Sequence, residues 1–435
     1  MKKGLKKPIA LLLSAMMIFS TSASAFPAMA EDNLIFGKAE NNSIHSDYES
    51  EITVTTCENQ ENPLETETKT VSTTTEVSVQ YNEEQTENNP VEVHNSDYAV
   101  YAVSSNEYEQ PEGDGSESSP YQISNSSQLF WFAKQVNSGN TSINAVLTTN
   151  IVVNQNVLNA NGTLNTSLTN LIEWTPIGNE SNKYTGTFDG QNHTISGLYF
   201  DKSTAFVGLF GYNKGTIKNV GIIDSYFKGF NRVGGVCGEN NSKIENSYNT
   251  GLVSGSGNNV GGICGNNFDT IENSYNTGTV SGSKNVGGIC GYNYYYVTIK
   301  NSYNTGSVSG SGNNVGGICG DNNGTITNSY NTGSVSGTEQ IGGVCGYNSD
   351  TIENSYYLEN CNANGTKFDC NEGTKQTSEQ FENGEVAYRL GGIWGQEIEK
   401  DKLPVLNGKK VYENITYTGC CEKYQGNITY NYSNK

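Results

Sequence analysis

The sequence predicts an all-β fold: a right-handed parallel β-helix solenoid with short capping helices at each end and a disordered acidic N-terminal segment. Six near-identical units follow one another between Val207 and Tyr356, and they begin at spacings of 26, 27, 26, 29 and 26 residues. Their apolar residues form short clusters separated by Asn, Gly and Ser, as in strands rather than helices. A unit of this length cannot bury its apolar face alone, so neighbouring units must stack into a continuous core.

Residues 1–30 have the organisation of a secretory signal peptide. Four lysines precede an apolar run from Ile9 to Phe19, and small-residue motifs follow at Ala23–Ala25 and Ala28–Ala30, with cleavage expected at the second. The run is too short for a stable membrane span, and no second run of spanning length follows. We therefore expect an extracellular protein, secreted or associated with the cell surface, without a transmembrane segment after cleavage.

Residues 31–112 are predicted to form an acidic disordered stalk. The chain has a formal net charge of −20 at pH 7, and this segment holds 19 Asp and Glu residues against Lys38 and Lys69. It has too few large apolar residues to offset the entropy that ordering would cost. The acidic balance, with only Arg232 and Arg389 as arginines, argues against nucleic-acid binding.

Each repeated unit is expected to contain three strands. In the unit that begins at Val260 these are Val260–Cys264, Thr270–Tyr275 and Thr279–Ser281. Length differences between units fall in only two places, which is typical of turns between stacked strands. Gly261 and Gly262 suit a tight corner, where a Cβ atom would collide with the next coil.

Stacking converts each position of the unit into a column of side chains. An isoleucine column and a valine column are expected inside the coils, while an asparagine column can bond along the stack and to the turn backbone. The interior columns are Ile244, Ile271, Ile299, Ile326 and Ile352, and Val253, Val280, Val308 and Val335. The asparagine column is Asn219, Asn246, Asn273, Asn301, Asn328 and Asn354.

The repeated unit resembles the GLUG motif, of the form GG-aliphatic-aliphatic-G-x-N, then T-I-x-N, then an aromatic residue and a closing G-x-V-S-G. The segment DGSESSPYQISNSSQLFWFAKQVNSG at 114–139, with YTGTFDGQNHTISGLYF at 184–200, resembles the lead-in to such repeats in bacterial surface proteins. TSEQFENGEVAYRLGGIWGQ at 377–396 is similar to the segment that closes them. The resemblance implies a bacterial extracellular protein with a β-helical body.

The rest of the chain then divides into three parts. Residues 113–206 form an N-terminal cap with the first coils, residues 207–360 form six repeat coils, and residues 361–435 form a C-terminal cap and tail. Ser124 or Ser126 can cap a first helix, and a second helix is expected from Ser378 to Leu390. The apolar residues of these helices are Leu129, Phe130, Trp131, Phe132 and Val136, and Phe381, Val386, Tyr388 and Leu390. Both helices would cover the open sheet edges at the ends of the stack.

Two groups of tyrosines are the candidate ligand-binding residues. One is a column expected to point outward as an aromatic strip: Tyr226, Tyr248, Tyr275, Tyr303, Tyr330 and Tyr356. The other is an outcrop at the longest turn: Tyr292, Tyr294, Tyr295 and Tyr296. Exposed aromatic side chains can stack on sugars or anchor a protein partner. The column could instead pack on itself or on the C-terminal tail.

Five cysteines occupy one position of successive units, where the GLUG motif usually has an aliphatic residue. They are Cys237, Cys264, Cys290, Cys319 and Cys345. Parallel side chains fit the torsion of a disulfide poorly, and neither a CxxC motif nor a nearby histidine favours a metal, so we expect buried reduced thiols. Cys361 and Cys370 could close a loop in the tail. Cys420 and Cys421 remain unassigned.

Nothing in the sequence indicates catalysis. The ten acidic residues of 207–360 lie mostly at unmatched positions, whereas polysaccharide cleavage needs clustered carboxylates. Immunoglobulin-A metallopeptidases with GLUG repeats need HExxH, which His45, His94 and His193 do not provide. Asp189 and His193 stand close together in an apparent turn. No catalytic residue, metal site or cofactor is expected.

We therefore expect a monomeric adhesin-like binding module or stalk for a glycan or a host or matrix protein. Two alternatives stay open. One is a carbohydrate-active β-helix enzyme, a polysaccharide lyase or hydrolase, and the other is a purely structural spacer.

Overall fold

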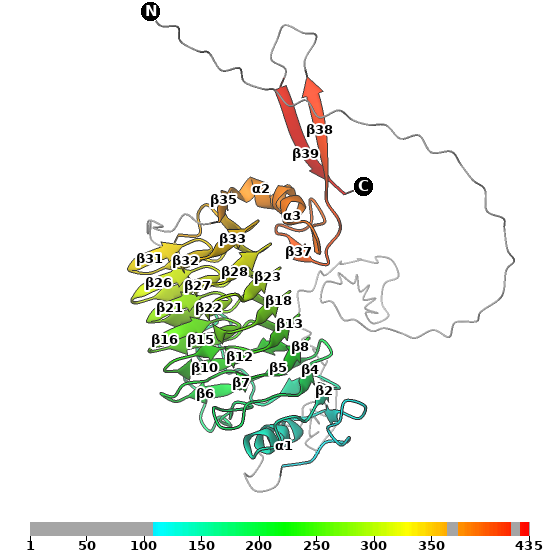
Figure 1. Ribbon diagram of the computed structural model, residues 1–435, viewed down its shortest axis with the longest axis vertical. Coiled ribbons are helices and arrows are strands. Elements are labelled where there is room, and N and C mark those ends of the chain that lie inside the picture. Colours follow the sequence, from blue (N-terminus) through cyan, green and yellow to red (C-terminus); the bar gives the residue numbers. More distant parts are fainter. Residues whose placement is uncertain (1–107, 363–372, 419–426, 435) are drawn as a thin grey trace, which may run out of the picture. The chain divides into compact units, whose positions relative to one another are not determined.

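The computed structural model describes residues 108–362, 373–418 and 427–434, which build a stack of parallel β coils with helices at both ends (Figure 1). The expected signal peptide and the stalk up to residue 107 lie outside the described residues. The last stalk residues, 108–112, pack against the N-terminal cap. The ring of Tyr108 stacks on Phe130 with centroids 5.4 Å apart, and Glu112 pairs with Gln122.

A complete coil contains five short strands, so the prediction of three was wrong. The coil of Val260 consists of β16 (Asn258–Gly261), β17 (Cys264–Asn267), β18 (Thr270–Glu272), β19 (Tyr275–Asn276) and β20 (Val280–Gly282). The strand expected at Val260–Cys264 bends after Gly261. The strand expected at Thr270–Tyr275 is interrupted by Asn273, whose φ is 51°. Both breaks are corners at which the chain turns around the core.

Equivalent strands of successive coils pair in parallel and in register, and they form five sheets that we number I to V in chain order within the coil. Sheet I contains β11 (Val233–Gly234), β16, β21 (Lys284–Gly287), β26 (Asn313–Gly316) and β31 (Glu339–Gly342). Sheet II contains β7 (Phe210–Asn213), β12 (Cys237–Asn240), β17, β22 (Cys290–Asn293), β27 (Cys319–Asn322) and β32 (Cys345–Asn348). Sheet III contains β1 (Tyr121–Ile123), β2 (Ala145–Leu147), β4 (Thr187–Asp189), β8 (Thr216–Lys218), β13 (Lys243–Glu245), β18, β23 (Thr298–Lys300), β28 (Thr325–Thr327) and β33 (Thr351–Glu353). Sheet IV contains β3 (Ile151–Val152), β5 (Thr194–Ser196), β9 (Gly221–Ile223), β14 (Tyr248–Asn249), β19, β24 (Tyr303–Asn304), β29 (Tyr330–Asn331), β34 (Tyr356–Leu358) and β35 (Thr374–Gln376). Sheet V contains β6 (Tyr199–Asp201), β10 (Tyr226–Gly229), β15 (Leu252–Gly255), β20, β25 (Val308–Gly310) and β30 (Val335–Ser336).

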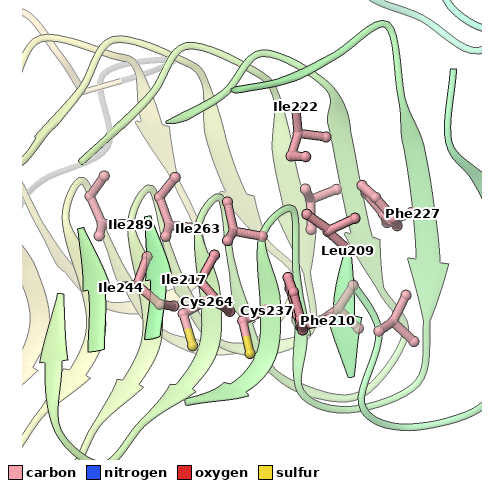
Figure 2. Close-up of a cluster of buried hydrophobic side chains, with 14 of the residues drawn as sticks. Leu209, Phe210, Ile217, Ile222, Phe227, Cys237, Ile244, Ile263, Cys264 and Ile289 are labelled. Carbon is pink, nitrogen blue, oxygen red and sulfur yellow. The ribbon is translucent and has the colours of Figure 1, made fainter. Parts of the chain in front are cut away.

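The interior is filled by columns of apolar side chains that point toward the axis of the coils (Figure 2). Both predicted interior columns are confirmed as buried, except that Ile352 in the last repeat coil is only partly buried. The glycine corner is also confirmed. A Cβ atom on Gly262 would lie 2.2 Å from the carbonyl oxygen of Gly288 in the next coil. The coils therefore approach each other too closely at this corner for any side chain.

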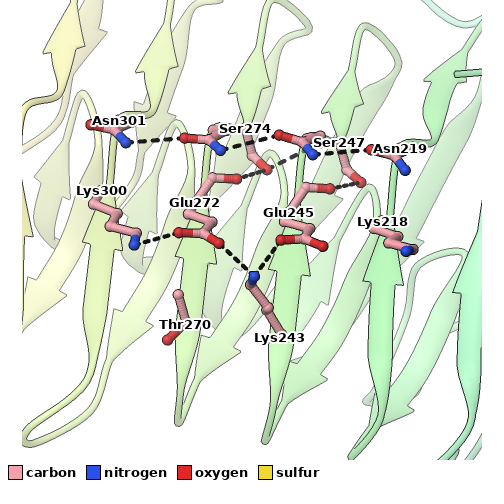
Figure 3. Close-up of polar contacts among 12 residues, drawn as sticks. Lys218, Asn219, Lys243, Glu245, Ser247, Thr270, Glu272, Ser274, Lys300 and Asn301 are labelled. Atoms are coloured by element: carbon pink, nitrogen blue, oxygen red, sulfur yellow. Dashed lines mark hydrogen bonds and ion pairs between the residues drawn. The ribbon is translucent and has the colours of Figure 1, made fainter. Parts of the chain in front are cut away.

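The predicted asparagine column forms the corner between sheets III and IV. Its six residues have φ between 45° and 54°, a left-handed conformation that Asn tolerates better than most residues. Their amides bond along the stack, for example Asn246 Nδ2 to Asn219 Oδ1 at 3.0 Å (Figure 3). Two further ladders of this kind, fully buried apart from a half-buried Asn348, were not predicted: Asn213, Asn240, Asn267, Asn293, Asn322 and Asn348 on sheet II, and Asn249, Asn276, Asn304 and Asn331 on sheet IV.

The N-terminal cap is α1 (Ser126–Asn137), which buries Leu129, Phe132 and Val136 against the first coils. Its N-cap is Asn125, not either of the expected serines. The Oδ1 atom of Asn125 accepts from the backbone N–H of Gln128 at 2.9 Å.

The C-terminal cap consists of two short helices, α2 (Ser378–Glu382) and α3 (Glu385–Leu390), where we expected one. The chain breaks between them at Gly384, whose φ of 90° is a left-handed conformation. Phe381, Val386 and Leu390 are buried as predicted, but Tyr388 is 41% exposed.

Two antiparallel pairs complete the cap: β36 (Trp394–Gly395) with β37 (Val405–Leu406), and β38 (Tyr412–Thr418) with β39 (Asn427–Ser433). Within the described part of the chain, no helix combines the length and apolar character that crossing a bilayer requires.

Candidate functional site

The predicted tyrosine column is a continuous stack of rings on sheet IV. From Tyr248 through Tyr275 and Tyr303 to Tyr330, successive centroids lie 4.8, 4.8 and 5.1 Å apart, with the planes within 9° of parallel. Each inner ring therefore has another ring over both of its faces. Only ring edges can reach solvent, whereas a sugar stacks on a ring face.

Both ends of this tyrosine stack are covered. A Cβ atom on Gly221, the register partner of Tyr248, would lie 2.2 Å from Cζ of Tyr248, so that ring lies directly on the Gly221 backbone. At the other end the C-terminal cap buries Tyr330 and Tyr356, which are 1% and 6% exposed. These two residues cannot contribute to an exposed strip.

Tyr226 does not belong to the tyrosine stack, so its assignment to the column was wrong. It lies on sheet V, where it pairs with Tyr199 and Leu252. The position of Tyr248 in the preceding coil is held by Gly221. The spacing from Tyr226 to Tyr248 is 22 residues, whereas the later tyrosines are 26 to 28 residues apart. This shorter spacing was the sequence signal that Tyr226 does not belong to the column.

Three tyrosines of the second group lie in the turn between β22 and β23, whereas Tyr292 lies in β22 itself, so its assignment to the loop was wrong. Tyr294, Tyr295 and Tyr296 are 40%, 50% and 96% exposed, and Phe268 from the preceding coil packs against Tyr294 with centroids 4.7 Å apart. Tyr292 stands at the base of the turn, half-buried. Burial, followed by the nearby Asp321 carboxylate, raises its pKa to about 12. We call Phe268, Tyr292, Tyr294, Tyr295 and Tyr296 the aromatic turn.

The aromatic turn adjoins an outer column of sheet II that was not predicted. This column consists of Tyr212, Glu239, Asn266, Tyr292, Asp321 and Tyr347, in register. Asn314 and Asn323 donate to the Asp321 carboxylate at 3.3 and 2.9 Å, and burial raises the pKa of that carboxyl. Its sequence signal is the variable residue of the repeated C-G-x-N, which reads F-G-Y-N in the first repeat coil. The column is buried at Tyr212, Glu239 and Asn266 and reaches solvent at Tyr347.

We expected the acidic residues to lie mostly at positions that do not recur between coils. On sheet III, however, Glu245 and Glu272 occupy the same position in successive coils and form a charged column with lysines. Lys243 lies between Glu245 and Glu272, and Lys300 pairs with Glu272 at 2.5 Å (Figure 3). Burial of Glu272 opposes ionisation, but the two lysines outweigh it and lower the pKa of the carboxyl. Glu272 is therefore ionised at neutral pH and cannot serve as a general acid. The arrangement stabilises the sheet and offers no catalytic pair.

The cysteine column lies in register on sheet II, with every member buried and free of disulfides. The thiol of Cys264 donates to the carbonyl oxygen of Asn266 at 2.9 Å, and burial raises the pKa of that thiol. Cys361 is also buried. Cys370, Cys420 and Cys421 lie outside the described residues.

Asp189 and His193 flank a turn through Gln191 and Asn192, both of which have positive φ. The Asp189 carboxylate pairs with Lys218 at 3.4 Å and accepts from Asn219 at 2.9 Å. In the described ranges, no three His, Cys, Asp or Glu side chains are grouped so that they could hold a metal ion.

The repeat, its in-register columns and its capped ends define a parallel β-solenoid. The family model described as the GLUG motif matches residues 256–281 and 282–309. Among curated proteins the chain is similar to halomucin of Haloquadratum walsbyi, with 35% identity over 149 residues, or 33% of this chain. The match spans only 2% of halomucin.

Among solved structures, the fold is similar to that of a Bacteroides ovatus protein described as a "putative immunoglobulin A1 protease". The TM-score is 0.51 at 22% sequence identity, and the match covers 68% of this chain and 94% of that one. At this level of identity the likeness concerns the fold alone.

Proposed function

We propose that this protein is an exported β-solenoid, secreted or held at the cell surface, that acts as an adhesin-like module and contacts a protein partner through the aromatic turn. The signal-peptide pattern of residues 1–30 supports export. The exposure of Tyr294, Tyr295 and Tyr296 in the longest coil is the observation that carries the binding role.

The chemistry of the aromatic turn suits a protein partner. Tyrosine supplies a large contact area with only two side-chain torsions to fix, and it is enriched at interaction hot spots. Packing of Tyr294 on Phe268 and Tyr295 holds the cluster together before any partner arrives. Tyr296 keeps a positive φ of 64°, which is uncommon for a bulky residue and is often found at binding sites.

An array of purified matrix proteins and glycans tests this proposal. The variant Tyr294→Ser/Tyr295→Ser/Tyr296→Ser should lose binding to at least one arrayed protein, while Tyr388→Ser, at an exposed tyrosine of the C-terminal cap, should bind as the native chain does. If the triple variant lost binding only to arrayed glycans, the partner of the aromatic turn would be a saccharide and not a protein. Identical binding by the native chain and the triple variant would overturn the aromatic turn as the contact site.

A second assay distinguishes the binding module from the alternative, a carbohydrate-active enzyme. Incubation with polygalacturonate-type polymers should leave their length unchanged, because the neighbouring Glu245 and Glu272 carboxylates on sheet III are paired with lysines. Shortening of the polymer would establish catalysis. A chain that neither binds nor cleaves would be a structural spacer.

A further inference from the structure

A hollow of about 340 Å³ lies at the N-terminal end of the solenoid, away from the aromatic turn. Its lining includes the buried or half-buried apolar residues Pro176, Phe200, Ala205 and Phe206, and the exposed Glu180 and Ser181 form its polar rim. This volume is at the lower end of the roughly 300–1,000 Å³ of small-molecule sites. An aromatic floor with a few polar groups at the rim is the composition that such sites share.

The wall of the hollow is fixed before any ligand arrives. Asn137, the last residue of α1, donates from Nδ2 to the carbonyl oxygen of Pro176 at 3.0 Å and accepts at Oδ1 from the N–H of Gly178 at 2.9 Å. The Asn179 side chain accepts from the N–H of Ser181 at 3.0 Å. A pre-formed wall lowers the entropic cost of binding.

Phe206 stands at a backbone position that its side chain does not favour. Its φ is 62°, and the same register position in later coils holds Arg232, Asn259, Asn285, Asn314 and Gln340, whose φ values lie between 51° and 63°. The left-handed corner is therefore a general feature of the coils, and Phe206 differs from its counterparts in placing an aromatic ring at this corner, beside the hollow. Arg232 holds the ring in place, with its guanidinium carbon 4.7 Å from the ring centroid.

We propose that this hollow binds one neutral pyranose unit of a saccharide. The C–H face of a pyranose suits the apolar floor, and its hydroxyls suit the carboxylate and hydroxyl of the rim. Acidic sugars are disfavoured because Glu180 lies at the rim and the nearby cations are engaged. Lys202 pairs with Glu173 at 2.7 Å, and Lys183 lies over the Tyr212 ring at 4.7 Å.

Ligand-observed NMR on the full chain tests the proposal with the methyl glycosides of glucose, galactose, mannose, N-acetylglucosamine and glucuronic acid as probes. At least one neutral glycoside should bind, and methyl glucuronide should bind about tenfold more weakly or not at all. Phe206→Asn removes the ring and supplies the residue type that this register holds in three later coils, so the coil should keep its fold. This variant should weaken binding about tenfold.

Glu180→Gln, at an exposed position, is the second variant and should weaken binding several-fold without changing the unfolding temperature. Tyr296→Ala should leave glycoside binding unchanged, so failure of the aromatic turn as a protein contact leaves this proposal standing. Absence of binding by all neutral glycosides at about 10 mM, or equal binding by the native chain and both hollow variants, would overturn it.

Discussion

The ring of Trp394 packs against the ring of Tyr330, with centroids 5.3 Å apart and planes at 59°. The indole Nε1 also donates to the carbonyl oxygen of Asn328 at 2.9 Å. A residue of the C-terminal cap thereby joins the tyrosine stack of the repeats. The stack is thus part of the interface that holds the cap on the solenoid.

Trp394→Ala should release this cap. Loss of a buried tryptophan costs about 3–5 kcal/mol, and here it also exposes the ring of Tyr330. Urea denaturation followed by tyrosine fluorescence should show the loss, together with faster proteolysis of 378–418. Trp394→Phe keeps the packing and loses only the hydrogen bond, so it should cost about 1 kcal/mol. Native-like stability of Trp394→Ala would contradict the role of this contact.

Tyr275→Ala should destabilise the solenoid without affecting ligand binding. Tyr275 stacks on both neighbours, and each aromatic pair contributes about 0.5–1.5 kcal/mol beyond its buried area, so we expect a loss of at least about 2 kcal/mol. Tyr296→Ala serves as the exposed control and should change stability by less than about 0.5 kcal/mol. If Tyr275→Ala abolished array binding while leaving stability intact, the stack would be a ligand site.

The buried asparagine ladder on sheet IV should be sensitive to a single deletion. Asn276 donates to Asn304 Oδ1 and to the Gly278 carbonyl, both at 2.8 Å, and accepts from Asn249 at 2.9 Å. Asn276→Ala leaves these partners unsatisfied and should lower the free energy of unfolding by roughly 2–4 kcal/mol. Asn273→Gly, at the left-handed corner, should cost less than about 1 kcal/mol because glycine accepts its φ. Equal losses for the two variants would contradict this difference.

The charged column should make stability depend on pH and salt. Because the folded pKa of Glu272 lies below its usual 4.5, its stabilising contribution is present above pH 4.5 and is lost as the pH falls through the folded value. The pKa of Lys243 is raised above 10.5 by Glu245 and Glu272, so its contribution disappears as the pH rises through that raised value. Glu272→Gln should therefore be less stable than the native chain at pH 7 and equal to it near pH 2. A difference that persists at pH 2, or that 1 M salt leaves unchanged, would exclude an electrostatic origin.

The cysteine column should stay reduced and unreactive in the folded protein. Burial raises the pKa of the Cys264 and Cys319 thiols, and solvent does not reach them. Iodoacetamide at pH 8 should label Cys237, Cys264, Cys290, Cys319 and Cys345 only after denaturation, as peptide mass spectrometry would show. Rapid labelling of Cys290 in the folded chain would reveal an activated thiol in the column.

The period of the sequence was sufficient to predict the solenoid, the register and the interior columns, because in-register stacking maps each repeat position onto one environment. The number of strands was wrong because a left-handed residue such as Asn273 ends a strand without interrupting the apolar pattern. The break between α2 and α3 at Gly384 has a similar cause. These corners depend on backbone conformation, which hydrophobic periodicity does not report.

The candidate site was less predictable. Of the two alternatives for the tyrosine column, packing on itself and on the C-terminal tail is the one observed. The repeat could not decide between them, because burial of Tyr330 and Tyr356 depends on a cap that folds back over sheet IV. The hollow beside Phe206 brings together α1, the segment around Pro176 and the strand of Phe200. Phe200 and Phe206 lie in register with later coils, but α1 and the segment around Pro176 have no counterpart in the repeat, so the repeat gives no signal for the hollow. By contrast, the outer column of sheet II could have been found from the variable position of C-G-x-N.

Along each asparagine ladder an asparagine stacks on an asparagine of the next coil, and this has a consequence for how many coils the molecule can hold. If residues 286–314 were removed, Cys264 would meet Cys319, Ile271 would meet Ile326 and Asn276 would meet Asn331, all like with like. The junctions among the coils that begin at Val233, Val260, Val286 and Val315 are interchangeable in this sense. The first and last repeat coils are not, since Phe210 lies opposite Cys237 and Tyr357 opposite Asn331. A gene of this kind can therefore gain or lose whole coils, adjusting the reach of the protein in steps of about 4.8 Å with both ends unchanged.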